Sequence, residues 1–265
     1  MSVLEPDMAS SLLKCGANPH TVDGFGRGAL IFGAGNGNAE VVRLLLTAGL
    51  KADEKDMYGD TALMAAAASG NPESVRLLLS GGADVNSQNS RRQTALLSGA
   101  TGDSGYSIME MGRRHAEVPE ETIHRDRVAQ LLVDAGANID ARGWFGETAL
   151  FSLHRDAVQE LIRNHINLET RDDSGETALI DTVPASIAGL LIDAGANVNA
   201  QDDDGETALI KAAERHYVRK LAVLVKAANI QLEQRDNEGE TALMKAKAAR
   251  FEDCAQVLIA AGATQ

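Results

Sequence analysis

The chain has 265 residues, a formal net charge of −13 and only 3% aromatic residues. This acidic balance argues against a nucleic-acid partner, because contacts to phosphates need a basic surface. No apolar run approaches the length of a membrane span, and residues 1–7 carry neither the basic region nor the apolar core of a signal peptide. We therefore expect a protein that binds neither nucleic acid nor membrane.

The chain has two cysteines, Cys15 and Cys254, near opposite ends of the sequence. This separation argues against a disulfide between them, and free thiols are typical of a reducing compartment. The sequence therefore favours a cytoplasmic location.

A pentapeptide theme recurs seven times and ends in Thr-Ala-Leu in six of its copies. The copies are marked by the alanines Ala29, Ala62, Ala95, Ala149, Ala178, Ala208 and Ala242. The intervals between these alanines are 33, 33, 54, 29, 30 and 34 residues. A period near 33 is typical of a stacked repeat array and not of a globular domain with one closed core.

A second theme follows each pentapeptide. In residues 131–140 and 190–199 it reads Leu-Leu, three further residues, and then Gly-Ala-Asn followed by an apolar residue and Asn or Asp. An apolar face that ends at a Gly is the signature of a helix C-terminus, and Asn and Asp close the turn after it.

The two linked themes together resemble the ankyrin repeat, over roughly residues 11–265. The resemblance implies a hairpin finger and two antiparallel helices in each repeat. It predicts an all-α ankyrin-repeat solenoid of about 7.5 repeats with short β-hairpin fingers, in a single domain over residues 1–265. It also implies that the fingers and first helices line a concave surface that binds other proteins.

The chain departs from the family pattern at one position in every repeat. The family's Thr-Pro-Leu-His reads here as Thr-Ala-Leu followed by an apolar residue such as Met64 or Ile210. The lost His removes hydrogen bonds that the family makes between neighbouring repeats, so we expect the array to depend more on apolar packing. The Thr-Ala-Leu variant is similar to that of bacterial ankyrin proteins.

In chain order, residues 1–21 are expected to form a partial capping repeat, because they match a second helix without a preceding Thr-Ala-Leu. Regular repeats begin near Val22 and Lys55, and a repeat of normal length begins near Gln201. The repeats that begin near Arg142 and Arg171 are short: from Thr to the second helix takes 13 residues instead of 16. Each has lost about one helical turn at the corner between its helices.

The third full repeat carries an insert at about 103–122. From Thr94 to Leu131 the chain has 37 residues, where the regular second repeat has 16, a surplus of 21. Pro119 with two acidic residues behind it predicts a helix start, with the helix running to Asp134. The apolar residues of the insert indicate either packing on its own array or a second docking element.

Sequence motifs for catalysis are weak. Residues 102–105 resemble part of a serine-protease nucleophile motif without its scaffold, residues 33–37 lack dinucleotide-loop spacing, and residues 202–205 lack calcium-loop spacing. The six histidines form no close metal pair in sequence. We therefore expect no enzyme activity, cofactor or metal site. The alternative is an enzyme or ligand sensor around the insert at 103–124, where His115 and His124 would meet.

Candidate partner-binding residues lie at the predicted finger tips. Aromatic and Arg side chains commonly anchor interfaces, and they gather in the N-terminal half of the array: Phe25, Tyr58, Arg91, Arg142, Trp144 and Phe145. Acidic tips follow in the C-terminal half: Asp173, Asp203, Asp204, Glu206 and Glu238. The alternative is that the aromatics pack against the next finger and the acids close turns. The predicted function is a monomeric, non-catalytic scaffold that binds another protein.

Overall fold

The structure is a computed structural model that describes residues 6–102, 122–151, 155–182 and 184–264. The described residues form fourteen α-helices and one short 3-10 helix, with β structure limited to isolated antiparallel bridges. This confirms the predicted all-α class. The chain divides into two compact units, residues 1–144 and 145–265. The single domain stays a prediction, and the insert at about 103–122 lies outside the described residues except for Thr122.

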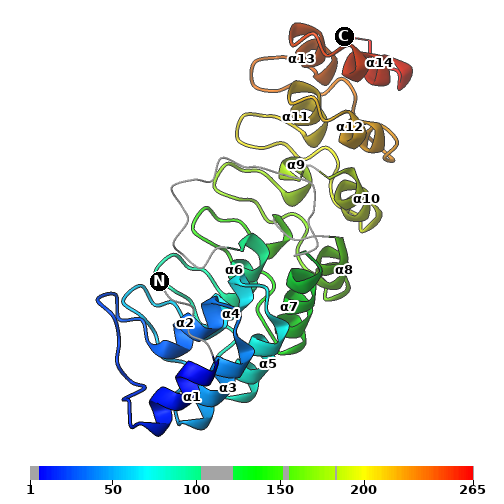
Figure 1. Ribbon diagram of the computed structural model, residues 1–265. Helices are drawn as coiled ribbons and strands as arrows, with labels where there is room; N and C mark the ends of the chain where they lie inside the picture. The colour runs from blue at the N-terminus through cyan, green and yellow to red at the C-terminus, as the bar shows by residue number, and fades with distance from the viewer. Residues whose placement is uncertain (1–5, 103–121, 152–154, 183, 265) are drawn as a thin grey trace. The chain divides into compact units, whose positions relative to one another are not determined.

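The N-terminal unit is built from two layers of helices. The first helices of the repeats are α2 (Ala29–Gly35), α4 (Ala62–Ala68) and α6 (Ala95–Thr101), and α4 packs between the other two (Figure 1). The second helices are α3 (Ala39–Thr47), α5 (Pro72–Ser80) and α7 (Thr122–Asp134). The remaining helix, α1 (Pro6–Lys14), packs on α3, where a partial first repeat is expected.

The C-terminal unit repeats the same two-layer arrangement (Figure 1). Its first helices are the 3-10 helix η1 (Ala149–Phe151), α9 (Ala178–Asp181), α11 (Ala208–Glu214) and α13 (Ala242–Ala248), and α11 packs between α9 and α13. Its second helices are α8 (Arg155–Arg163), α10 (Ala185–Asp193), α12 (Val218–Leu224) and α14 (Glu252–Ala260). Helix α12 packs between α10 and α14.

In five of the six Thr-Ala-Leu copies, the side chain of the Thr caps the first helix of its repeat. The hydroxyl of Thr61 accepts a hydrogen bond from the amide of Met64 at 3.3 Å, and Thr207 does the same for Ile210 at 3.2 Å. Such an N-cap satisfies one of the amides that a helix start leaves without a partner. The Ala and Leu that follow are buried. The repeated tripeptide is therefore a cap followed by two core residues.

The short repeat that begins near Arg171 loses its missing turn from the first helix. Helix α9 has 4 residues, whereas α11 in the next repeat has 7. Pro184 stands where α9 would continue, and proline lacks the amide that the next helical hydrogen bond needs. The predicted loss of a turn at the corner is thus located at the C-terminal end of α9.

The interior of the stack is made of small side chains. All seven residues of α4 are buried, and five of them are alanines. A helix that packs on both sides needs small residues for its neighbours to approach closely. The low aromatic content of the chain follows from this arrangement.

Candidate functional site

Six of the finger turns are closed by the side chain of an Asp or Asn, whereas the finger that carries Trp144 has Gly143 at this position. The Oδ1 atom of Asp56 accepts hydrogen bonds from the amides of Tyr58 and Asp60, both at 2.9 Å. The same two bonds recur at Asp23, Asn89, Asp172, Asp202 and Asp236. At these positions the Asp or Asn side chain holds the turn, and none of them is a candidate partner-binding residue.

Backbone hydrogen bonds join consecutive finger tips. In the N-terminal unit the amide of Met57 donates to the carbonyl of Phe25 at 3.0 Å, and Ser90 donates to Tyr58 at 2.8 Å. In the C-terminal unit equivalent bonds join Asp173 to Phe145, Asp203 to Ser174 and Asn237 to Asp204. These bonds therefore fix the backbone of the tips.

Glycine occupies the position next to these links in six of the seven fingers, and Arg92 takes the same positive φ in the third. Gly59 has a φ of +81°, and a Cβ atom placed there would lie 3.2 Å from the Cα of Asn89 in the next finger. Only Gly takes a positive φ without strain and leaves room for so close a backbone. The Gly of the repeated pentapeptide thus permits the fingers to stack.

Large apolar side chains project from the tips of the N-terminal unit. Trp144 is 57% exposed and Phe25 is 46% exposed, with Tyr58 and Met57 also exposed. The guanidinium of Arg27 lies 4.9 Å from the centroid of the Phe25 ring, so this ring packs on a residue of its own finger. A hollow beside these tips is lined by His20, Val22, Leu30, Ile31, Lys55 and Ala62.

Basic side chains accompany the apolar tips in this unit. Lys55 and Arg142 are exposed, and Arg91 is half-buried. The acids of the same fingers, Asp56 and Asp60, are buried and turned toward the array. The N-terminal unit therefore presents apolar groups and positive charge at its tips.

The tips of the C-terminal unit are mainly acidic. Asp173, Asp203, Asp204 and Glu238 are exposed. Phe145, at 59% exposure, is the large apolar side chain on these tips. Glu206 differs from the other predicted residues, because it is buried and its carboxylate lies 3.5 Å from Lys211. That carboxylate faces the interior of the array and not a partner.

A buried ion cluster links two repeats of the C-terminal unit. The Nζ atom of Lys211 on α11 hydrogen-bonds the carboxylate of Glu176 in the preceding repeat and that of Asp202 in its own finger. Burial alone would lower the pKa of Lys211, but these hydrogen bonds outweigh it and raise the pKa. The pKa of Glu206 is raised by burial and by the charge of Glu214. Three carboxylates thus share one ammonium.

The next repeat carries a similar cluster around Lys245 on α13. Its Nζ lies 3.0–3.2 Å from Asp236, Glu238 and Glu240. Burial would lower the pKa of Lys245, whereas the hydrogen bonds to the three carboxylates raise it well above its usual range. The Lys211–Glu176 pair and a 3.8 Å contact between Lys245 and Glu214 are polar contacts between repeats, and they accompany the apolar packing that the lost His led us to expect.

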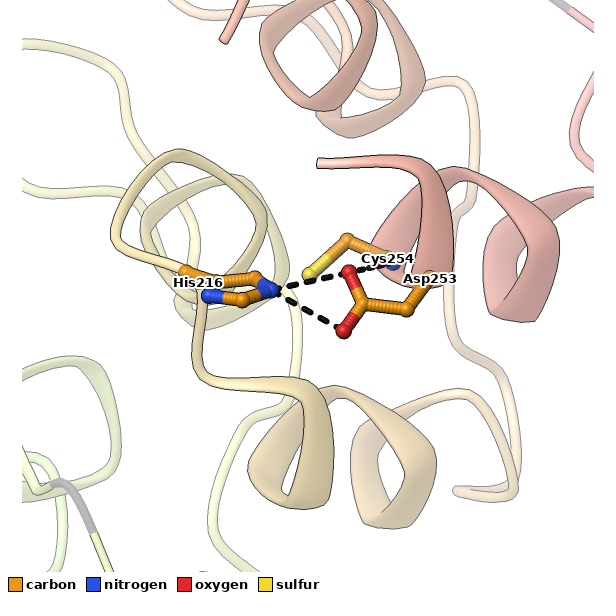
Figure 2. Close-up of side chains that lie close together, drawn as sticks. All are labelled: His216, Asp253 and Cys254. Atoms are coloured by element: carbon orange, nitrogen blue, oxygen red, sulfur yellow. Dashed lines mark hydrogen bonds and ion pairs between the residues drawn. The ribbon is translucent and has the colours of Figure 1, made fainter. Parts of the chain in front are cut away.

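His216, Asp253 and Cys254 form a third cluster, shown in Figure 2. The Nε2 atom of His216 lies 2.8 and 2.9 Å from the two carboxylate oxygens of Asp253. The His216 ring stacks on Phe251, with ring centroids 4.4 Å apart. Cys254 is buried, and its Sγ lies within 4.8 Å of the His216 and Asp253 ligand atoms. Burial raises the pKa of the Cys254 thiol.

Comparison with known protein families assigns this architecture. A family profile described as "Ankyrin repeats (3 copies)" matches residues 3–89 and 183–265, more than half of the chain. The chain belongs to the ankyrin-repeat family. Ankyrin repeats are general protein-interaction modules and are typically without enzyme activity. A comparison with curated protein sequences gave no match.

Solved ankyrin structures share the fold. The ankyrin repeat domain of human ASB11 is 20% identical, with a TM-score of 0.71 over 90% of this chain and all of that chain. The ankyrin repeat domain of Bcl-3, a unique member of the IkappaB protein family, is 22% identical, with a TM-score of 0.51 over 96% of this chain and 91% of that chain. At these identities the likeness shows the fold alone. Neither structure supports a bacterial subtype.

The resemblance to ankyrin repeats did not predict the ion clusters around Lys211 and Lys245 or the cluster of His216, Asp253 and Cys254. Lys211 and Lys245 each stand four residues after the capping Thr, and a Glu precedes that Thr in four consecutive repeats. That spacing was a usable signal for an ion pair between repeats. His216 and Cys254 are 38 residues apart, and only the stacking of the last two repeats brings them together. Among the described helices, none is long and apolar enough to cross a membrane.

Proposed function

We propose that this ankyrin-repeat chain is a non-catalytic scaffold that binds another protein through its finger tips and the concave face beside them. We further propose that it acts in the cytoplasm as a monomer, with neither nucleic acid nor membrane as its partner. The observation that carries the proposal is the contrast at the tips, where the backbone is tied to the next finger while large apolar side chains remain exposed.

The exposed tips have the composition of an interface. Trp, Tyr, Phe and Arg are the residues that most often dominate binding energy, and a rigid backbone lowers the entropy lost on binding. Phe25, Tyr58, Arg91, Arg142 and Trp144 lie on tips of the N-terminal unit, with Phe145 at the start of the C-terminal unit. An extended or helical segment with apolar and acidic residues suits this set.

The acidic tips suit a different part of the partner. Asp173, Asp203, Asp204 and Glu238 are exposed, and they favour a basic segment. Charges at the rim of an interface mainly change the association rate and its salt dependence. We assign them to steering and the aromatics to affinity.

The proposal is tested by capturing partners with the immobilised chain, identifying them by mass spectrometry, and titrating each with Trp144→Ala. Truncation of a central aromatic anchor costs about 2 kcal/mol or more, so binding should weaken by more than roughly tenfold. The matched control is Ile259→Ala, which shortens an exposed apolar side chain on α14. Unchanged affinity for both Trp144→Ala and Phe25→Ala, with thermal unfolding also unchanged, would move the binding surface off the fingers.

A further inference from the structure

The cluster of His216, Asp253 and Cys254 joins two consecutive repeats of the C-terminal unit. His216 lies at the corner between α11 and α12, and the other two residues lie in the first turn of α14. The three side chains point into the same space in Figure 2. Their ligand atoms, imidazole nitrogen, carboxylate oxygen and thiol sulfur, all lie within 4.8 Å of one another.

Two of these residues lie at positions that carry other residue types in earlier repeats, and they meet at one place. The corner position of His216 is occupied by Gly37 and Gly70 in the first two regular repeats, where the backbone also has a positive φ. His216 takes a φ of 61°, which is unusual for a residue with a Cβ atom. The helix position of Cys254 is occupied by Val41 in α3, Ser74 in α5 and Lys220 in α12. Arg250 takes a φ of 60° at the same corner of the last repeat, so the fold accepts residues other than Gly there.

We propose that His216, Asp253 and Cys254 bind a zinc ion. Zinc accepts imidazole, carboxylate and thiolate ligands in tetrahedral sites, and three protein ligands with one water is an established set. With zinc–ligand bonds of about 2.0–2.3 Å, the ligand atoms would be separated by roughly 3.3–3.8 Å. The cluster therefore needs only small side-chain shifts, in which the Nε2–carboxylate pair opens and the thiol approaches.

The surroundings suit a metal ion. The side chains of His216 and Asp253 are 48% and 53% exposed, so an ion can enter and water can supply the fourth ligand. Stacking on Phe251 holds the imidazole ring in place, as the outer shell of a metal site commonly does. When zinc binds, the Cys254 S–H bond breaks, a Zn–S bond forms, and the proton passes to solvent.

The other cluster of possible metal ligands, Asp236, Glu238 and Glu240, is already occupied by a cation of the protein itself. The Lys245 ammonium lies 3.0–3.2 Å from the carboxylates of these three residues. Their negative charge is thereby balanced within the chain. The His216 cluster combines the three ligand types that zinc prefers, and bound zinc would tie the corner before α12 to the start of α14.

The test uses two restoring variants, in each of which one ligand is replaced by the residue that an earlier repeat carries at the equivalent position. His216→Gly and Cys254→Val each remove one ligand but install the residue that an equivalent position already carries, so both variants should fold without metal. Cys15→Ser is the control, because it removes the exposed cysteine outside the cluster. Zinc binding is measured by calorimetry, and cobalt(II) serves as a spectroscopic probe for a metal–thiolate bond.

We expect the wild-type chain and Cys15→Ser to bind one zinc ion, to show the cobalt–thiolate absorption band, and to unfold several degrees higher with zinc present. Each restoring variant should bind zinc at least roughly a hundredfold more weakly and lose both the band and the thermal shift. The proposal is overturned if the wild-type chain does not bind zinc. It is equally overturned if both restoring variants bind zinc as tightly as the wild-type chain.

Discussion

The ammonium group of Lys220 donates a hydrogen bond to the backbone carbonyl of Ile180, with 2.8 Å between the two atoms. In a longer helix this carbonyl would accept from the amide of residue 184, but Pro184 has no amide hydrogen. Lys220 comes from α12 in the following repeat. A side chain of one repeat therefore satisfies a carbonyl that the short helix α9 leaves open in the repeat before it.

The position of Lys220 has an electrostatic consequence. Its side chain is almost fully buried, at 1% exposure, and burial lowers its pKa to about 7. The charges of Asp181 and Glu176 act in the opposite direction, whereas those of Arg215 and Lys211 add to the lowering. In the unfolded chain the pKa of a Lys is about 10.4. Above pH 7 the folded chain therefore binds fewer protons than the unfolded chain.

We predict that the free energy of unfolding of the C-terminal unit rises between pH 7 and 8.5. Stability increases with pH wherever the unfolded state binds more protons, and this window should add about 1–2 kcal/mol. Below pH 7 the contribution is flat, because Lys220 is protonated in both states. Denaturant unfolding of the wild-type chain and of Lys220→Met checks the prediction. An equal slope in both would show that Lys220 is not the group that titrates.

The buried cluster around Lys211 predicts a large loss of stability on truncation. Lys211→Met leaves Glu176 and Asp202 buried without their cation, and breaking a buried pair in this way costs about 3–5 kcal/mol. The control is Arg163→Met, which removes an exposed ion pair with Glu160 in the same unit and should cost under about 1 kcal/mol. Thermal unfolding distinguishes them. Similar losses for the two variants would show that the cluster contributes no more than a surface pair.

Two adjacent acids at one finger should behave differently. Asp202 accepts hydrogen bonds from two finger amides and from Lys211, so Asp202→Asn should destabilise the unit by about 1–3 kcal/mol. The side chain of Asp203 is exposed, so Asp203→Asn should change stability by less than about 0.5 kcal/mol. For partner binding we expect the opposite order, measured where both variants are folded. Asp203→Asn should then slow association more than Asp202→Asn at low salt, and the effect should fade at high salt. A salt-independent effect of Asp203→Asn would count against steering.

The short first helices should open more readily than the regular ones. The amide of Asp181 in α9 and that of Lys211 in α11 occupy the same position, each bonded to the carbonyl of the capping Thr four residues before. Because α9 has 4 residues and α11 has 7, we expect the Asp181 amide to exchange at least about ten times faster. Hydrogen exchange followed by NMR measures both in one sample. Equal protection would show that neighbouring repeats compensate for the missing turn.

The architecture was predictable because its determinants are local and repeated. A capping Thr, a buried Leu and a turn-closing Asp recur at a fixed period, so each copy supports the others. The short repeats were also visible, as a difference of three residues in spacing. What the spacing did not show was how the missing turn is compensated, because Lys220 and Ile180 are 40 residues apart and meet only through stacking.

The candidate binding surface was predictable in part. The exposure of Phe25, Tyr58 and Trp144 follows from their place at the turn, which the pentapeptide marks. The inward orientation of Glu206 was not predictable, because nothing in the sequence distinguishes it from the neighbouring acids Asp203 and Asp204. Lys211, a turn further along α11, draws that carboxylate inward. Side-chain direction at a finger thus depends on charges that are close only in the folded array.

The claim that the finger tips bind a partner is tested most directly by photo-crosslinking. Benzoylphenylalanine is placed at position 144 on a finger tip and, in a separate variant, at position 259 on α14, both of which carry exposed apolar side chains. The account predicts that a captured partner crosslinks from position 144 and not from position 259. Crosslinking from position 259 alone, in a chain that still binds the partner, would contradict it.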